Sequence, residues 1–185
     1  QVVDMALLDT QVAMLANQAS NQLIGHKTPT RMGNAHPNIV PYQVFPTRDG
    51  HMVLAVGNDG QFARFCDACD HPEVSRDARF STNPARVEHR AVLVPLLTGW
   101  TLQRDTADWG QLLDAAGVPC SPILDIAQVM EHPHVAARRL RLQREVDGTP
   151  PMIANPMVMD GQRPVAELPP PALGAHPARW LHATP

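Results

Sequence analysis

Apolar residues recur at helical spacing in the first part of the chain. They are separated by three or four positions and are Val2, Met5, Leu8, Val12 and Leu15. This spacing is that of one face of an amphipathic helix. We therefore expect a single helix over residues 2–23, ended by Gly25 and Pro29, the residue types that stop helices.

Runs rich in β-forming residues predict strands in the next part of the chain. The segment YQVFPTRDGHMVLAVG contains two such runs on either side of Asp49-Gly50, a dipeptide that favours a hairpin turn. In the second run the residues on both faces are apolar, which indicates burial on both sides. Further along, the segment VPCSPIL predicts another short strand.

Two helices are predicted immediately after the hairpin. Asp59 is placed to cap a helix over residues 60–69, because its carboxylate can accept hydrogen bonds from the free amides of the first turn. Asn83-Pro84 is typical of a cap followed by a proline at the first helical position, and we expect that helix to run to Trp100. Its inward-facing residues are expected to be Val87, Ala91, Val94 and Leu97.

The remaining elements are shorter. A helix from Thr106 to Ala116 is expected to close at Gly117, and Asp125 is expected to cap a further short helix. From Leu140 the sequence becomes proline-rich and weakly periodic. We therefore expect an extended tail that lies on another surface and forms no core of its own.

Composition narrows the class of protein. A chain of 185 residues can form a domain with a proper core. The formal charge of -3, with both signs interspersed, gives no footprint for nucleic acid or an anionic membrane. No apolar run approaches the roughly 20 residues of a membrane span. Three cysteines do not make a disulfide framework and favour a cytoplasmic setting.

Each cluster of candidate ligand groups also has a packing explanation. Cys66, Cys69 and His71 offer a C-x-x-C for zinc or dithiol chemistry, but no second pair accompanies them and both cysteines fall on an apolar helical stripe. His132 and His134 in EHPH could be half a metal site, or a turn between helices. We favour packing and a turn, and we expect no metal.

A single basic cluster stands out in the sequence. It is ARRLRLQR, with Arg138, Arg139, Arg141 and Arg144. We favour a solvated helix end or strand face for these residues.

The glycine-rich stretch LAVGNDGQF lies between a predicted strand and a predicted helix. Backbone amides at a helix N-terminus suit an oxyanion, a carboxylate or a thioester carbonyl. A plain capped turn is the alternative, and the residues alone leave both open.

Longer blocks resemble a known family. RMGNAHPNIVPYQVFPTRDGHMVLAVGNDGQFARFC resembles the signature block of class III CoA-transferases of the CaiB/BaiF type, the family of formyl-CoA transferase and α-methylacyl-CoA racemase. NPARVEHRAVLVPLL, AAGVPCSPILDIAQVMEHPHVAARRL and PPPALGAHPARWL resemble later blocks in the same order. The resemblance therefore covers nearly the whole chain.

The resemblance implies an α+β fold in three parts. We expect a linker helix at 1–27, a small domain with a short antiparallel sheet surrounded by helices at 28–139, and an extended return segment at 140–185. The return segment would lead back to a large nucleotide-fold domain whose sequence precedes residue 1. We expect the chain to be the C-terminal part of a longer polypeptide, because the helical pattern is already running at residue 1.

The resemblance also implies an activity. Class III CoA-transferases move CoA from an acyl-CoA to a carboxylic acid through intermediates on an enzyme aspartate, which we expect upstream, so no catalytic residue is expected in this chain. The CoA thioester is a substrate, no cofactor is expected to be bound, and the implied partner is a second copy in an interlocked homodimer. An acyl-CoA racemase and a non-catalytic dimerisation or binding module are the alternatives.

By position, one loop resembles the mobile glycine-rich loop that closes over the aspartyl intermediates. Its residues are Gly57, Asn58, Asp59, Gly60 and Gln61. Closure would protect a reactive anhydride or thioester from water. Asn34 and His36 in GNAHP either line the same cleft or form a turn held by side-chain hydrogen bonds.

Overall fold

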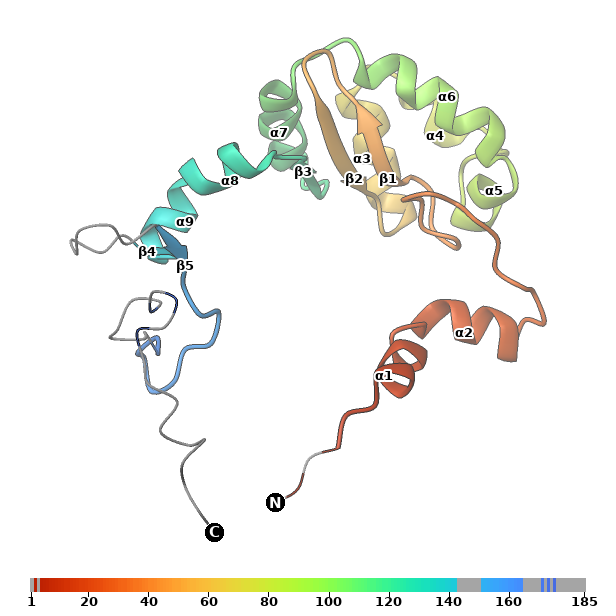
Figure 1. The fold of residues 1–185 in the computed structure, drawn as a ribbon. Helices are drawn as coiled ribbons and strands as arrows, with labels where there is room; N and C mark the ends of the chain where they lie inside the picture. The colour runs from red at the N-terminus through yellow and green to blue at the C-terminus, as the bar shows by residue number, and fades with distance from the viewer. Residues whose placement is uncertain are drawn as a thin grey trace. The chain divides into compact units, whose positions relative to one another are not determined.

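The computed structural model describes residues 2, 4–142, 151–164, 171, 173 and 175. It consists of two compact units, Gln1–Ile123 and Leu124–Pro185 (Figure 1). The domain boundaries expected at 27/28 and 139/140 stay a prediction. No helix in the described part is long and apolar enough to cross a membrane.

A three-stranded antiparallel sheet forms the centre of the first unit. Its strands are β1 (Tyr42–Pro46), β2 (His51–Ala55) and β3 (Cys120–Pro122), in the order β1-β2-β3. The hairpin turn falls at Asp49-Gly50 as predicted, and Thr47 N donates to Gly50 O at 2.9 Å. The α+β class expected from the sequence is confirmed.

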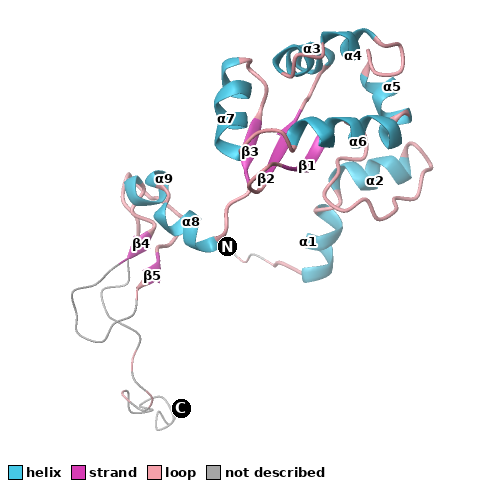
Figure 2. Cartoon of the chain, turned by 90° about the horizontal axis from the view of Figure 1, so that it is seen from above, coloured by secondary structure: helices cyan, strands magenta, loops and turns pink. Residues whose placement is uncertain are grey.

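Helices cover this sheet. Those that follow the hairpin in the first unit are α3 (Asp59–Ala68), α4 (Pro72–Arg76), α5 (Asn83–Glu88), α6 (Arg90–Thr101) and α7 (Thr106–Ala115). Figure 2 shows α7 beside β3 at one edge of the sheet and α6 beside β1 at the other. The left-handed Gly117, with φ +63°, follows α7 as the sequence predicts.

The core lies between the sheet and these helices. Its members are apolar side chains drawn from every layer, among them Phe45, Leu54, Phe62, Phe65, Leu93, Leu97, Trp109 and Leu113. Trp109 satisfies its buried indole N–H by donating to Thr101 O at 2.8 Å. The helical spacing of Phe62 and Phe65 places both on the inner face of α3.

The N-terminal helix is interrupted, contrary to our expectation of one helix over 2–23. Two helices are present, α1 (Leu7–Ala13) and α2 (Ala16–Leu23). Ala16 has a φ of 40°, in the left-handed region that breaks a right-handed helix. Leu8 and Val12 are exposed, so the described part of the chain does not bury the apolar face that would favour one continuous helix.

The predicted helix from Asn83 to Trp100 is also divided. His89, with φ -96° and ψ 20°, separates α5 from α6. Thr82 caps α5, while the Asn83 amide oxygen accepts a hydrogen bond from Val40 N at 3.1 Å. Ala91, expected to face inward, is exposed, because the buried face of α6 runs through Leu93, two positions later and about 200° around the helix.

Four short elements lie in the described residues of the second unit. They are α8 (Ile126–Glu131), α9 (Pro133–Ala137) and the antiparallel pair β4 (Arg141–Leu142) and β5 (Met152–Ile153). Asp125 caps α8 as predicted and forms a capping box with Gln128. His132 lies between α8 and α9, where its ring accepts from His134 N at 3.1 Å, so EHPH is the predicted turn.

Candidate functional site

The glycine loop connects the central strand β2 to α3. Asn58 has an extended backbone, and its side-chain oxygen accepts a hydrogen bond from Gln61 N at 2.9 Å. Asn58 is therefore the N-cap of α3. The prediction that Asp59 is the cap was wrong, because Asp59 already lies at the first position of the helix.

The loop is closed on itself by a second hydrogen bond. Gly57 N donates to the side-chain oxygen of Gln61 at 2.6 Å. The two hydrogen bonds tie the ends of the turn to each other. The Asn58 side chain accepts from Gln61 N, and the Gln61 side chain accepts from Gly57 N. The backbone amides of Asp59 and Gly60 are left without intrahelical acceptors, as in any first helical turn.

Neither glycine of the loop has a left-handed backbone. A Cβ at Gly57 would lie 3.3 Å from the side-chain oxygen of Gln61, and one at Gly60 would lie 3.4 Å from that of Asn58. Glycine at position 57 therefore allows the Gln61 side chain to approach closely, and no left-handed backbone requires it.

Asp59 binds a buried arginine that the sequence analysis missed. Arg86 on α5 is 0% exposed and donates from Nη2 to Asp59 Oδ1 at 2.8 Å. It also donates to Val40 O at 2.6 Å and to Phe80 O at 2.9 Å, and its guanidinium lies 4.4 Å from the centre of the Phe62 ring. Arg86 thereby joins the segments at Val40 and Phe80 to the loop.

A signal for Arg86 was present in the sequence. Arg86 precedes Leu93 by seven positions and Leu97 by eleven, and both leucines are buried. A charged residue in phase with an apolar stripe indicates a buried charge that requires a partner.

Asn34 and His36 lie in the connection before β1. Asn34 accepts a hydrogen bond from Val44 N at 3.0 Å, and His36 accepts one from Asn38 N at 3.1 Å. The His36 ring stacks on Tyr42 with the centroids 5.3 Å apart. Their side chains hold this turn against β1, and a role in lining a cleft stays a prediction.

The cysteines of the C-x-x-C pack against the core. Cys66 is buried and Cys69 is half-buried, and burial raises the pKa of each thiol to about 12. The predicted packing role is confirmed. His71 stacks on Trp100 at 4.4 Å and contacts Glu73 at 3.2 Å. Among the described residues no group of three His, Cys, Asp or Glu side chains is placed to hold a metal.

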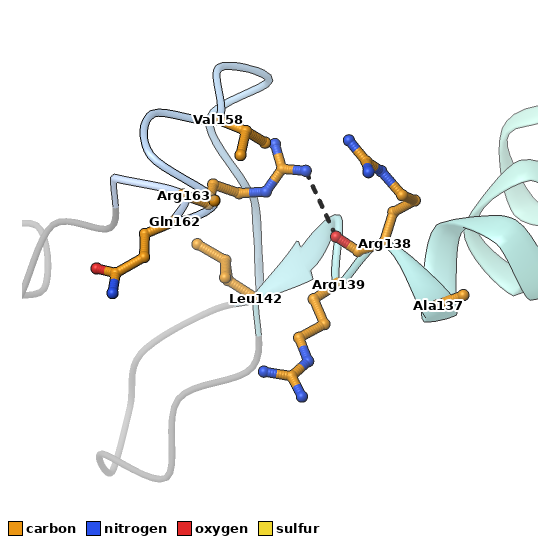
Figure 3. Close-up of a pocket in the computed structure, with 8 residues that line it drawn as sticks. Ala137, Arg138, Arg139, Leu142, Val158, Gln162 and Arg163 are labelled. Atoms are coloured by element: carbon orange, nitrogen blue, oxygen red, sulfur yellow. Dashed lines mark hydrogen bonds between the residues drawn. The ribbon is translucent and has the colours of Figure 1, made fainter.

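The second unit contains a cavity of about 560 Å³ lined by Arg138, Arg139 and Arg163 (Figure 3). Arg163 donates to the carbonyl oxygen of Asn155 and, at 3.5 Å, to that of Arg138. The first contact lies within the 155–163 segment, and the second joins that segment to Arg138 at the end of α9. Arg138 and Arg139 are exposed, as predicted for the basic cluster, whereas Arg144 lies outside the described residues.

The sheet and its flanking helices define a small α+β unit, and the chain is similar in fold to a CaiB/BaiF-type structure. A CAIB/BAIF family protein from Brucella suis superposes with a TM-score of 0.78 at 39% identity, over 98% of this chain and 47% of that one. Rv3272 from M. tuberculosis gives 0.76 at 26% identity, over 96% and 47%.

Sequence comparison identifies the family. Residues 1–177 match CoA-transferase family III, and the chain belongs to this family. A succinate--glutarate CoA-transferase of Agrobacterium fabrum is 45% identical over 98% of this chain and 46% of its own length. A human succinyl-CoA:glutarate CoA-transferase is 37% identical over 97% and 41%. The chain thus spans about half the length of the curated relatives it matches.

Proposed function

We propose that this chain forms the small-domain portion of an acyl-CoA:carboxylate CoA-transferase. The observation that carries the proposal is the match to CoA-transferase family III over residues 1–177. The relatives with 45% and 37% identity are both named CoA-transferases. We place the nucleophilic aspartate in the half of the relatives that this chain does not cover, and we assign no catalytic residue to the chain itself.

The proposed reaction exchanges CoA between two carboxylic acids. The enzyme carboxylate attacks the acyl-CoA carbonyl, which forms a mixed anhydride and releases the CoA thiolate. The thiolate then attacks the enzyme side of the anhydride, which gives an enzyme thioester and frees the first acid. Attack by the acceptor carboxylate and return of the thiolate reverse these steps with the second acid, and the enzyme carboxylate is regenerated.

The names of several relatives support a short dicarboxylic acid as the acceptor. Two relatives are named for glutarate together with succinate or succinyl-CoA. Others with 35% and 28% identity are named for citramalate and mesaconate. We therefore propose succinyl-CoA as donor and a dicarboxylic acid of four or five carbons as acceptor, in a cytoplasmic homodimer that binds neither nucleic acid nor membrane.

We assign the loop Gly57–Gln61 the role of a lid. Both covalent intermediates react with water, so a segment that closes over them protects the acyl group. The loop's two internal hydrogen bonds, Gly57 to Gln61 and Gln61 to Asn58, support a preformed turn that moves as a unit. Asn34 and His36 would line the cleft on the β1 side.

The deciding experiment compares this chain with a longer polypeptide that includes the preceding half. Each is given succinyl-CoA and glutarate, and glutaryl-CoA is measured. We expect transfer by the longer polypeptide and none by the chain alone, because the nucleophile is absent. Transfer by the chain alone would contradict the placement of the nucleophile. Exchange of the α-proton of a chiral acyl-CoA with solvent, without CoA transfer, would favour a racemase instead.

A further inference from the structure

Arg86 is a buried charge that is satisfied by three separate segments. Each of its three nitrogens donates to a different acceptor: Nε to Val40 O, Nη1 to Phe80 O and Nη2 to Asp59 Oδ1. Two of these acceptors are neutral carbonyls. Among the described residues, Asp59 is the carboxylate that forms a salt bridge with Arg86. A buried cation without its counter-charge is unfavourable, so the position of Asp59 is coupled to the core.

The partner of Arg86 lies in the middle of the glycine loop. Asp59 is flanked by Gly60 and by the cap Asn58, and its side chain is 52% exposed. One carboxylate oxygen therefore faces inward to the arginine while the side chain remains at the surface of the loop. The two hydrogen bonds to Gln61 tie Gly57 and Asn58 to the same turn, so a displacement of the loop as a whole must break this ion pair.

We propose that Arg86 is a positioning residue that fixes the resting position of the glycine loop through Asp59. The ion pair between Arg86 and Asp59 returns the loop to this position after each displacement. Arg86 is enclosed by the core and acts on the reaction only through Asp59. This inference rests on the proposed function in assigning the loop to the transfer reaction, but the anchoring itself is independent of that assignment.

The first test needs no catalytic activity. Asp59→Asn keeps the shape of the side chain and one oxygen acceptor but removes the counter-charge of Arg86. Asp105→Asn is the matched control. Asp105 also lies at a helix N-terminus, immediately before α7, makes no cap hydrogen bond, and pairs with the surface residue Arg48 at 2.6 Å. Amide hydrogen exchange over residues 57–62 is measured for both variants in this chain.

We expect exchange in the loop to rise about tenfold in Asp59→Asn, as loss of a charge-assisted hydrogen bond would cause, and to stay at the unmodified rate in Asp105→Asn. Asp59→Glu, which keeps the charge, should restore most of the protection. Equal exchange in Asp59→Asn and Asp105→Asn would overturn the proposal. Because Asp59 is half-exposed, these variants are expected to fold even if changes at Arg86 do not.

The second test uses the longer, active polypeptide. Asp59→Asn should lower kcat about tenfold while KM for the acyl-CoA changes by less than about twofold, and Asp59→Glu should recover kcat. An unchanged kcat together with a lower melting temperature would show a purely structural pair and would refute the positioning role. If the unmodified polypeptide shows no CoA transfer, the proposed function fails, and the exchange experiment alone decides the anchoring by Arg86.

Discussion

Replacing Gly60 by alanine should stabilise the chain and, in the longer polypeptide, lower the rate of the proposed CoA transfer. Gly60 is the second residue of α3 and its φ lies outside the left-handed region. An added Cβ would lie 3.4 Å from Asn58 Oδ1 and 3.7 Å from the flexible side chain of Arg64, which are ordinary contacts. Alanine at a compatible helical position is favoured over glycine by about 0.5–1 kcal/mol.

Gly57, the other glycine of the loop, provides a comparison in which the added Cβ should lower the free energy of unfolding. At Gly57 a Cβ would lie 3.3 Å from the Gln61 side-chain oxygen, the same atom that accepts from Gly57 N. Gly57→Ala should therefore weaken this hydrogen bond and lower the free energy of unfolding by about 1 kcal/mol. Urea denaturation of this chain measures both changes, which are expected to have opposite signs.

Steady-state kinetics of the longer polypeptide then tests the lid. If the loop must change conformation to close, both variants lower kcat more than they raise KM for the acyl-CoA, although only one of them is destabilised. Gly60→Ala that is more stable and fully active would refute the lid and leave a capped turn. A loss of stability in Gly60→Ala would contradict the geometry on which the prediction is built.

Three further predictions concern the rest of the chain. Hydrogen bonds from Thr106 N and its hydroxyl to Asp49 lower the pKa of that carboxyl; its stabilising effect is therefore present above about pH 4 and lost on acidification below it, so Asp49→Asn should flatten the acid limb of a stability–pH curve. Cys66, with its pKa raised to about 12 by burial, should resist iodoacetamide at pH 8 until the chain is unfolded. The exposed apolar residues Leu8 and Val12 should make the isolated chain self-associate with rising concentration in light scattering, and changing both to glutamate should abolish this; a monomer at all concentrations would contradict it.

Signals confined to a few neighbouring residues were sufficient for part of the fold. The Asp49-Gly50 turn, the end of α7 at Gly117 and the Asp125 cap all lie where the sequence predicts them. Each depends on dihedral preferences or hydrogen bonds within about four residues, so the sequence alone contains the necessary information. The position of the glycine loop before a helix was predictable for the same reason.

Where two adjacent residues could do the same task, only the tertiary structure chose between them. Asn58 and Asp59 are both good caps, but Asp59 is drawn to Arg86, 27 residues away. Thr82 and Asn83 present the same choice, and Asn83 is taken by Val40 N, 43 residues away. Local propensities for these pairs differ by only tenths of a kcal/mol, whereas satisfying a buried charge or a buried backbone amide contributes more. The distant partner therefore decides, and its position is known only once the chain has folded.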